Sequence, residues 1–243
     1  VSFEEHMEFV KRVVAMVAGR IKVVAGTGSN STDEAIFLSR SAQDNGVDGV
    51  LLVNPYYNRP TQQGLIAHFE AIAKSISVPV ILYNIPGRTG VNFLPESIAE
   101  LVRRAGNIVA IKEASGDISQ MMRLMELCGD RLTLISGDDN LLLPVLAIGG
   151  RGIISVLSNM IPADVRRVVT LFNEGRHEEC RQAFYRLLPL CRAMFLETNP
   201  IPVKAGMEML GYCGSEVRLP LTPLSAGNRD ILKKTMLAYG ISL

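Results

Sequence analysis

The sequence predicts an α/β protein of the TIM (β/α)8 barrel type that lacks the first two strands and ends in a helical extension. Short runs of β-branched residues recur along the chain, and an amphipathic helical pattern follows each of them. This alternation is typical of βαβ units and of a parallel sheet that is buried on both faces. Unusual polar residues follow several of the runs, as expected where strand ends meet at the mouth of a barrel.

The expected elements follow one another in a regular order. The opening segment, VSFEEHMEFVKRVVAMV, has a helical pattern. The expected strands are Lys22–Ala25, Gly49–Val53, Val80–Tyr83, Val109–Lys112, Leu132–Ile135 and Ile153–Val156. The helices between them are expected at Thr32–Asn45, Gln63–Ser75, Pro95–Ala105, Ile118–Cys128 and Asn140–Ile148. After Val156 the pattern is helical only, with breaks around Pro200–Pro202 and Pro220–Pro223.

No linker rich in Pro, Gly or Ser divides the chain, so we expect an α/β barrel part over residues 1–161 and C-terminal helices over residues 162–243. A chain of 243 residues, of which 48% are hydrophobic, can bury a sizeable core. Six strands do not close a barrel that needs eight. Two open sheet edges would favour aggregation unless a partner or another segment covers them.

A doubly wound sheet is the competing architecture. Its glycine fingerprint would have to be GTGSNS at residues 26–31, which has no third glycine and no acidic residue at the end of the next strand. The alternative interpretation is a turn followed by a capping box, in which Ser31 pairs with Glu34. We therefore favour the barrel.

The composition argues against several classes of function. The 25 Lys and Arg residues nearly cancel the 24 Asp and Glu residues, so nucleic acid and anionic membranes have no electrostatic support as partners. The four cysteines are widely spaced and indicate reduced thiols of a cytoplasmic protein. The three histidines form no zinc-binding pattern, and no signal peptide or membrane-spanning run is expected.

Lys112 is unusual because it ends the apolar strand of NIVAIKEASGD. A lysine at a strand end commonly reaches solvent or pairs with a carboxylate. In the mouth of a barrel, however, an apolar environment lowers the lysine pKa from its usual value of about 10.4 and makes the amine nucleophilic. A neutral lysine forms a Schiff base with a ketone, and this chemistry needs no metal or organic cofactor.

Other polar residues at strand ends could support this chemistry. Tyr83 could shuttle protons, or its hydroxyl could simply bond to backbone. Arg88, in the Pro/Gly loop NIPGRTG, could bind a carboxylate or be solvated. Tyr56 and Tyr57 follow an Asn-Pro turn and suit a site or a subunit contact better than a core. The acids of GDDN at residues 137–140 fit a helix N-cap and first-turn charge better than a site.

Several motifs resemble the dihydrodipicolinate synthases, which are pyruvate-dependent class I aldolases of the N-acetylneuraminate lyase superfamily. They are VNPYYNRPTQQGLIAHF, ILYNIPGRTG, IVAIKEASGD, LISGDDN, GGRGIISVLSN and ETNPIPVKAGMEMLG, and they occur in family order and spacing along the whole chain. The resemblance implies a cytoplasmic lyase of lysine and diaminopimelate biosynthesis that condenses pyruvate with aspartate semialdehyde. Another pyruvate-dependent aldolase of the superfamily is the alternative activity.

The resemblance also implies roles for individual residues. Lys112 would form the Schiff base with pyruvate, Tyr83 would be the central proton relay, and Arg88 would bind the carboxylate of aspartate semialdehyde. Tyr57 would reach into the site of a neighbouring subunit, within a tight dimer that usually pairs into a tetramer. The remaining implied positions are Ile154 and Gly137 in the pyruvate pocket, and His6, Asn30, Glu34 and Tyr56 at a site for lysine as inhibitor.

Two departures from the family pattern affect these expectations. Phe3 stands where a second histidine of the lysine site is expected, and part of that site falls before residue 1. The first strand, helix and second strand of the family, with a proton-relaying Thr-Thr motif, have no counterpart in this sequence. One hypothesis is an enzyme whose N-terminal portion is missing from the chain. The other is a short, non-catalytic paralogue that acts as a scaffold or regulator, although such a protein would have no physical reason to keep a buried lysine.

Overall fold

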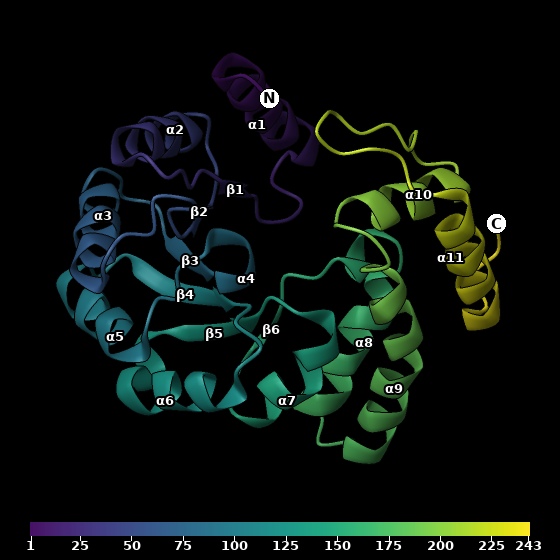
Figure 1. Cartoon of the computed structure of the whole chain (residues 1–243). Helices are drawn as coiled ribbons and strands as arrows, with labels where there is room; N and C mark the ends of the chain where they lie inside the picture. Colours follow the sequence, from purple (N-terminus) through teal and green to yellow (C-terminus); the bar gives the residue numbers. More distant parts are fainter. The chain divides into compact units, whose positions relative to one another are not determined.

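The computed structural model describes all 243 residues and contains one six-stranded sheet whose order, β1-β2-β3-β4-β5-β6, follows the sequence (Figure 1). The strands are β1 (Val24–Gly26), β2 (Gly49–Val53), β3 (Val80–Asn84), β4 (Ile108–Glu113), β5 (Thr133–Ser136) and β6 (Gly152–Ile153). The pairs β1/β2, β2/β3 and β3/β4 are parallel. A doubly wound sheet reverses its strand order partway, whereas a barrel keeps sequential order, so the α/β fold of barrel type is confirmed.

Helices follow the strands as the alternation predicted. They are α1 (Phe3–Val17), α2 (Thr32–Asp44), α3 (Gln62–Lys74), α4 (Pro86–Thr89), α5 (Pro95–Arg104), α6 (Ile118–Cys128) and α7 (Leu142–Ala147). The C-terminal helices are α8 (Pro162–Asn173), α9 (His177–Ala193), α10 (Ile201–Met209) and α11 (Ala226–Tyr239). Short 3-10 turns occur at η1 (Gly129–Arg131), η2 (Asp139–Leu141) and η3 (Leu157–Asn159). None of these helices is both long and apolar enough to span a bilayer.

Near the strand ends, one strand, one helix and one loop differ from what the sequence predicted. The last strand stops at Ile153 instead of Val156, because the carboxylate of Asp139 accepts hydrogen bonds from the N–H groups of Val156 and Leu157 and holds them in the turn that begins η3. The expected helix from Asn140 to Ile148 is a 3-10 turn followed by the short α7. The expected loop NIPGRTG contains α4.

The chain forms two compact units, each described by itself below. The first comprises residues 1–135 and 148–150, and the second comprises residues 136–147 and 151–243. The second unit thus includes η2 and α7 together with the C-terminal helices. The boundary expected from sequence, at residues 161/162, remains a prediction.

The core of the first unit lies between its strands and the helices that follow them (Figure 1). Leu52, Leu82 and Ile111 of β2, β3 and β4 are fully buried, and the rings of Phe69 and Phe93 stack with centroids 5.5 Å apart. Truncating a buried Leu or Ile of this kind to Ala typically destabilises a domain by about 2–5 kcal/mol. This packing fixes the strands whose ends carry the candidate site.

The loop after β1 explains the glycines of GTGSNS without a nucleotide. A Cβ atom on Gly28 would lie 2.4 Å from the backbone nitrogen of Val53, so only glycine allows this approach to β2. Ser31 is the N-cap of α2, and its side chain accepts a hydrogen bond from the N–H of Glu34. The hydrogen bond from the Glu34 N–H to the Ser31 side chain, which is one half of the expected capping box, is therefore confirmed. The Glu34 carboxylate instead accepts a hydrogen bond from the hydroxyl of Ser29 at 2.6 Å.

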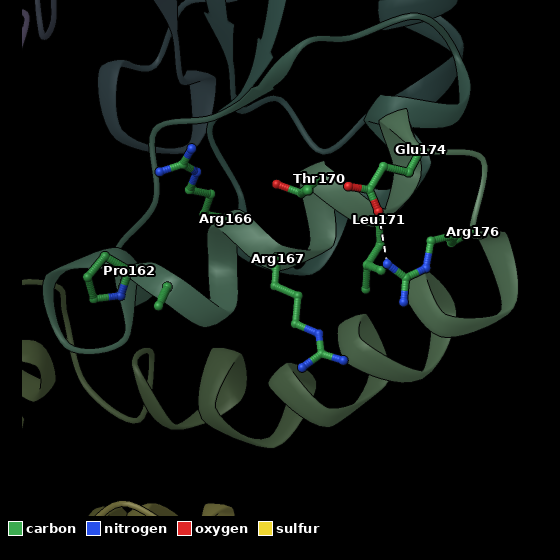
Figure 2. Close-up of a pocket in the computed structure, with 8 residues that line it drawn as sticks. Pro162, Arg166, Arg167, Thr170, Leu171, Glu174 and Arg176 are labelled. Carbon is green, nitrogen blue, oxygen red and sulfur yellow. Dashed lines mark hydrogen bonds and ion pairs between the residues drawn. The ribbon is translucent and has the colours of Figure 1, made fainter.

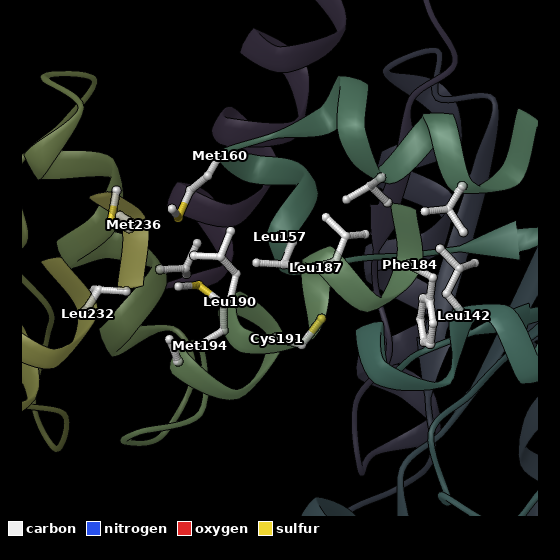
Figure 3. Packing of buried hydrophobic residues seen from close by; sticks show 14 of the residues in the cluster. Leu142, Leu157, Met160, Phe184, Leu187, Leu190, Cys191, Met194, Leu232 and Met236 are labelled. Carbon is white, nitrogen blue, oxygen red and sulfur yellow. The ribbon is translucent and has the colours of Figure 1, made fainter. Parts of the chain in front are cut away.

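The core of the second unit is formed by its helices (Figure 3). Leu187 and Leu190 of α9 and its C-cap residue Met194 are buried in one cluster with residues of α8, α10 and α11. Met160 Sδ would lie 2.7 Å from a Cβ atom on Gly206, so α10 approaches the turn after η3 closely at this glycine. The cluster also includes Leu142 and Leu157, which flank the two polar turns around Asp139 and Ser155.

Candidate active site

Tyr83 and Lys112 lie side by side at the C-terminal ends of β3 and β4. They are direct partners in the parallel register, and the Lys112 ammonium nitrogen lies 4.1 Å from the centroid of the Tyr83 ring. Both side chains are half-buried. An ammonium group over an aromatic face is attracted by the ring, typically by about 0.5–2 kcal/mol. The lysine is thus held against the tyrosine, where the strand-end pattern predicted convergence.

The opposite face of the same strand ends carries a buried polar row that the sequence argument did not recognise as a unit. Asn54, Asn84 and Glu113 each follow, by one residue, the positions occupied by Val53, Tyr83 and Lys112. All three polar residues have 0% of their surface exposed. Because successive residues of a strand point to opposite faces, this row lies behind the face that Tyr83 and Lys112 share.

Asn84 is the centre of this buried polar row. Its side-chain oxygen accepts hydrogen bonds from Asn54 Nδ2 at 2.8 Å and from the backbone N–H of Phe93 at 3.0 Å. Its Nδ2 donates to Glu113 Oε2 at 2.9 Å and to Asn92 Oδ1 at 2.8 Å. The Glu113 Oε1 atom accepts from the N–H of Ser115 at 2.7 Å. Both Glu113 carboxylate oxygens and both the oxygen and the nitrogen of the Asn84 side chain therefore form hydrogen bonds.

Burial has an electrostatic effect on Glu113. Removal from water raises the pKa of this carboxyl above its usual value, and the hydrogen bonds from Asn84 and Ser115 act in the opposite direction. The net direction is upward, so desolvation is the larger of the two effects. A buried acid is therefore present one residue beyond the candidate nucleophile.

Arg88 lies exposed in α4, directly after β3. Pro86 fixes the first turn, and Gly90 ends the helix in the left-handed conformation with φ 76°. The hydroxyl of Thr89 donates to the carbonyl groups of Ile85 and Val91 at 3.1 and 3.0 Å. The sequence predicted a Pro/Gly loop here, whereas the structure places Arg88 in the short helix α4.

Tyr57 has an unusual backbone conformation for a residue with a side chain. Its φ is 71°, the N–H of Asn58 donates to the carbonyl of Tyr56 at 2.9 Å, and 91% of the Tyr57 surface is exposed. An i to i+2 hydrogen bond around a positive φ is the pattern of a strained γ-turn. The Tyr57 N–H donates to the carbonyl of Thr89 at 3.3 Å, so a hydrogen bond joins this turn to the segment that carries Arg88.

Gly137 and Ile154 belong to the second unit, where each follows a strand end by one residue. The Ile154 N–H donates to the carbonyl of Ser136 at 3.0 Å, which brings the two segments together. The Asp139 carboxylate accepts from Ser155 Oγ as well as from the N–H groups that begin η3. The helix-capping interpretation of GDDN was partly wrong, because Asp138 occupies the N-cap position of η2 without a side-chain capping hydrogen bond, whereas Asp139 lies in the first turn as expected.

Three of the four residues expected at the lysine site lie near one another. Asn30 Nδ2 donates to the carbonyl of Tyr56 at 3.2 Å, and Glu34 lies one helical turn beyond Asn30 at the start of α2. His6 lies in α1, a separate element. Asn30, Glu34 and Tyr56 thus lie near one another, and a lysine site at these residues and His6 remains a prediction.

A hollow on the second unit lies apart in sequence from the predicted site residues. Figure 2 shows a hollow along α8 lined by Arg166, Arg167, Thr170 and the ion pair of Glu174 with Arg176, whose nearest atoms are 3.0 Å apart. Its arginines are exposed, and none of the predicted site residues lines it. No group of three or more His, Cys, Asp or Glu residues is arranged to hold a metal ion.

The sequence matches the Dihydrodipicolinate synthetase family over residues 1–239. It is 51% identical to the 4-hydroxy-tetrahydrodipicolinate synthase of Pelobacter propionicus, over 98% of this chain and 82% of that protein. It is 54% identical to the 4-hydroxy-tetrahydrodipicolinate synthase of Leptospira biflexa, over 93% of this chain and 76% of that protein.

Solved structures of similar fold point to the same group of proteins. The crystal structure of dihydrodipicolinate synthase from Aquifex aeolicus has a TM-score of 0.98 and 42% identity, covering 100% of this chain and 83% of that one. A chloride-inhibited dihydrodipicolinate synthase from Acinetobacter baumannii, complexed with pyruvate, has a TM-score of 0.96 and 38% identity, covering 100% and 83%. The enzyme from Cyanidioschyzon merolae with lysine bound has a TM-score of 0.97 and 42% identity, covering 100% and 82%.

Proposed function

The chain belongs to the dihydrodipicolinate synthetase family, and from this premise we propose that it is a lyase that condenses pyruvate with aspartate semialdehyde through a Schiff base on Lys112. The observation that carries the proposal is the position of the Lys112 ammonium group on the Tyr83 ring at the ends of β3 and β4. Schiff-base chemistry needs a nucleophilic amine and a nearby group that transfers protons, and a phenol can serve as that group.

Lys112 supplies the nucleophile in this proposal. Its neutral amine attacks the keto carbon of pyruvate, and the resulting carbinolamine loses water to give an iminium ion. The iminium nitrogen accepts the electron pair left when the pyruvate methyl group loses a proton. The enamine carbon then attacks the aldehyde of aspartate semialdehyde, and the amino group of this second substrate finally displaces Lys112.

Tyr83 transfers protons in this sequence. Carbinolamine formation, dehydration and carbon–carbon bond formation each move a proton to or from oxygen or nitrogen beside the lysine. The contact between Tyr83 and Lys112 supports this role, because a proton relay has to lie within reach of the reacting nitrogen. The pair is placed by strand register, so each turnover begins from the same geometry.

Substrate selection is proposed for Arg88, Ile154 and Gly137. Arg88 binds the carboxylate of aspartate semialdehyde through paired N–H groups, a geometry that a guanidinium supplies and an ammonium does not. Ile154 and Gly137 line the pyruvate pocket. Both expectations come from the family, and the placement of Gly137 and Ile154 directly after the ends of β5 and β6 supports the second.

We also propose that the protein acts as a homo-oligomer in which Tyr57 enters the site of a second copy. The near-complete exposure of this aromatic side chain and its strained backbone support the proposal. The oligomer is a tight dimer that pairs into a tetramer, and the compartment is the cytoplasm. Lysine is proposed as an inhibitor at His6, Asn30, Glu34 and Tyr56, on the likeness to the Cyanidioschyzon merolae enzyme with lysine bound.

The test of the activity is intact mass spectrometry after incubation with pyruvate and borohydride, which reduces the Schiff base to a stable adduct. The unaltered chain is expected to gain one adduct, and Lys112→Ala is expected to gain none. Lys22→Ala is the matched control, because Lys22 is an exposed lysine paired with Asp48 and should leave the adduct unchanged. A folded chain that gains no adduct overturns the proposal. Addition of aspartate semialdehyde or of a sugar-derived aldehyde then identifies the acceptor.

A further inference from the structure

The buried polar row behind the candidate site connects the ends of three strands through hydrogen bonds between side chains that are far apart in sequence. Asn54 directly follows β2, Asn84 ends β3 and Glu113 ends β4, and side-chain hydrogen bonds of 2.8 and 2.9 Å join them. Each is next in sequence to a residue of the register row Val53, Tyr83 and Lys112. A shift in one row therefore moves the other.

The Asn84 to Glu113 hydrogen bond spans the two strands that carry the candidate proton relay and nucleophile. Asn84 and Glu113 are direct register partners, one position beyond the partners Tyr83 and Lys112. The backbone strengthens this link, because the N–H of Ala114 donates to the carbonyl of Asn84 at 2.9 Å. These two residues thus determine how the ends of β3 and β4 align.

Asn84 also holds the segment that carries Arg88. Its side chain bonds to the backbone N–H of Phe93 and to Asn92 Oδ1, beyond the far end of that segment. Asn92 in turn exchanges hydrogen bonds with Gln120 of α6 at 2.7 and 3.2 Å. A single asparagine therefore joins the end of β2, the end of β4 and the segment from Ile85 to Phe93.

The donor and acceptor pattern at the centre of this row is fully specified. The Asn84 oxygen faces two donors and the Asn84 nitrogen faces two acceptors. Glu113 accepts at both oxygens, and neither residue is exposed to water that could replace a lost partner. An unpaired polar group in such a place is unfavourable, so this pair tolerates only arrangements that satisfy both members.

We propose that Asn84 and Glu113 are positioning residues, whose mutual hydrogen bond keeps Tyr83 and Lys112 in reactive alignment. This inference rests on the proposed function of Lys112. Neither residue touches the substrate. They act through the register of β3 and β4, where a misplacement on the order of 1 Å lowers a rate by about a hundredfold.

The test exchanges donor and acceptor between the two residues. Asn84→Asp places two acceptors face to face, and Glu113→Gln replaces one of two accepting oxygens by an NH2 donor, which then faces either Asn84 Nδ2 or the N–H of Ser115. The double variant Asn84→Asp/Glu113→Gln restores the bond in the reverse direction, with the new amide on β4 as donor and the new carboxylate on β3 as acceptor. Asn92 and Gln120 can turn their amides to follow this reversal, because each can both donate and accept.

The measurement is the rate of pyruvate trapping at Lys112 by borohydride, with circular dichroism to establish folding. Each single variant is expected to trap at least about tenfold more slowly, and the double variant within about threefold of the unaltered chain. Asn84→Asp is further expected to recover toward the unaltered rate as the pH falls, since one proton shared between two carboxyls restores a donor. A merely structural role predicts no such pH-dependent recovery in the folded protein.

The matched control is Asn107→Asp, the same chemical change at the other end of β4, where Asn107 Nδ2 donates to the carbonyl groups of Ala73 and Ile76 at 2.9 and 3.2 Å. It is expected to lower stability and leave the trapping rate of the folded chain unchanged. Single variants that fold and trap at the unaltered rate overturn the inference, as does a double variant no faster than the singles. No adduct in the unaltered chain overturns the proposed function and the inference together.

If a single variant does not fold, Asn92→Ser supplies the second test. Asn92 is half-buried, and this change removes the Asn84 to Asn92 bond while leaving the Asn84 to Glu113 bond intact. The expected result is an unchanged trapping rate with a raised KM for aspartate semialdehyde, because the Arg88 segment loosens. If the trapping rate falls by the same factor as kcat/KM, the Asn84 to Glu113 hydrogen bond is not what aligns Tyr83 with Lys112.

Discussion

The Lys112 ammonium nitrogen lies 4.1 Å from the centroid of the Tyr83 ring, and strand register alone brings these two residues together. Parallel neighbours on one face of a sheet have side chains close enough for direct contact, whatever their separation in sequence.

Tyr83→Phe is expected to lower kcat by about 10²–10⁴-fold, because the ring that supports Lys112 remains while the hydroxyl that transfers protons is lost. Steady-state kinetics with both substrates measures the change. Unfolding curves for the two proteins should nearly coincide, since Tyr83 is only half-buried. An unchanged kcat would assign the proton transfers to another group.

Arg88→Ala is expected to raise the KM for aspartate semialdehyde by roughly 10- to 150-fold, the equivalent of about 1.5–3 kcal/mol for a hydrogen bond to a charged group. Arg88→Lys should recover only part of this loss, because an ammonium group cannot bind a carboxylate through two parallel N–H groups. Pyruvate trapping at Lys112 should be unaffected. Arg123→Ala is the matched control, since Arg123 is an exposed arginine of α6 paired with glutamates. If the Arg88 variants keep the KM of the unaltered chain, another residue binds the carboxylate of aspartate semialdehyde.

The positions of the strands were predictable because their sequence signals are local. Apolar β-branched runs predicted the strand Gly49–Val53 with both of its ends correct. They also placed Tyr83 and Lys112 at or next to strand ends, as the structure confirms. The expectation that Tyr56 and Tyr57 are exposed is also confirmed. These features follow from periodicity, burial and turn residues within a few positions of one another.

The features that sequence reasoning missed depend on contacts between distant residues. Asn84 is one of the polar residues at the strand ends, but its place at the centre of the buried polar row depends on Asn54, Asn92 and Glu113, which come from other segments. The last strand ended early because the Asp139 carboxylate holds N–H groups 17 and 18 residues further along the chain. Period-two alternation could have placed the polar row on the face opposite Tyr83, but it could not have shown which members bond.

Tyr57→Gly is expected to be more stable than Tyr57→Ala by about 1–2 kcal/mol, because glycine adopts a φ of 71° without the steric conflict that a Cβ atom brings. The comparison isolates the backbone, since both variants lose the phenol ring. Urea unfolding of the two variants measures the difference. Both should lose activity if Tyr57 completes the site of a second copy, and equal stabilities would show that this turn is unstrained.

His68 gives the first unit a defined sensitivity to acid. Its ring is 6% exposed, Nδ1 lies 2.9 Å from the Thr32 hydroxyl, and Nε2 is buried without a partner. Burial lowers the pKa of His68 from 6.5 to about 4. A group whose pKa is depressed on folding binds its proton more tightly in the unfolded chain. Its protonation therefore favours unfolding.

The free energy of unfolding should consequently be at its full value above pH 6.5 and fall as the pH decreases from 6.5 toward 4. The expected loss at pH 5 is on the order of 2 kcal/mol relative to pH 7.5. Urea unfolding at the two pH values, with His68→Gln as the comparison, measures it. Glu113, whose pKa is raised, contributes with the opposite sign, and this contribution cancels because both proteins contain it. Identical pH dependence in the two proteins would mean that the buried imidazole is already accommodated as a cation in the folded state.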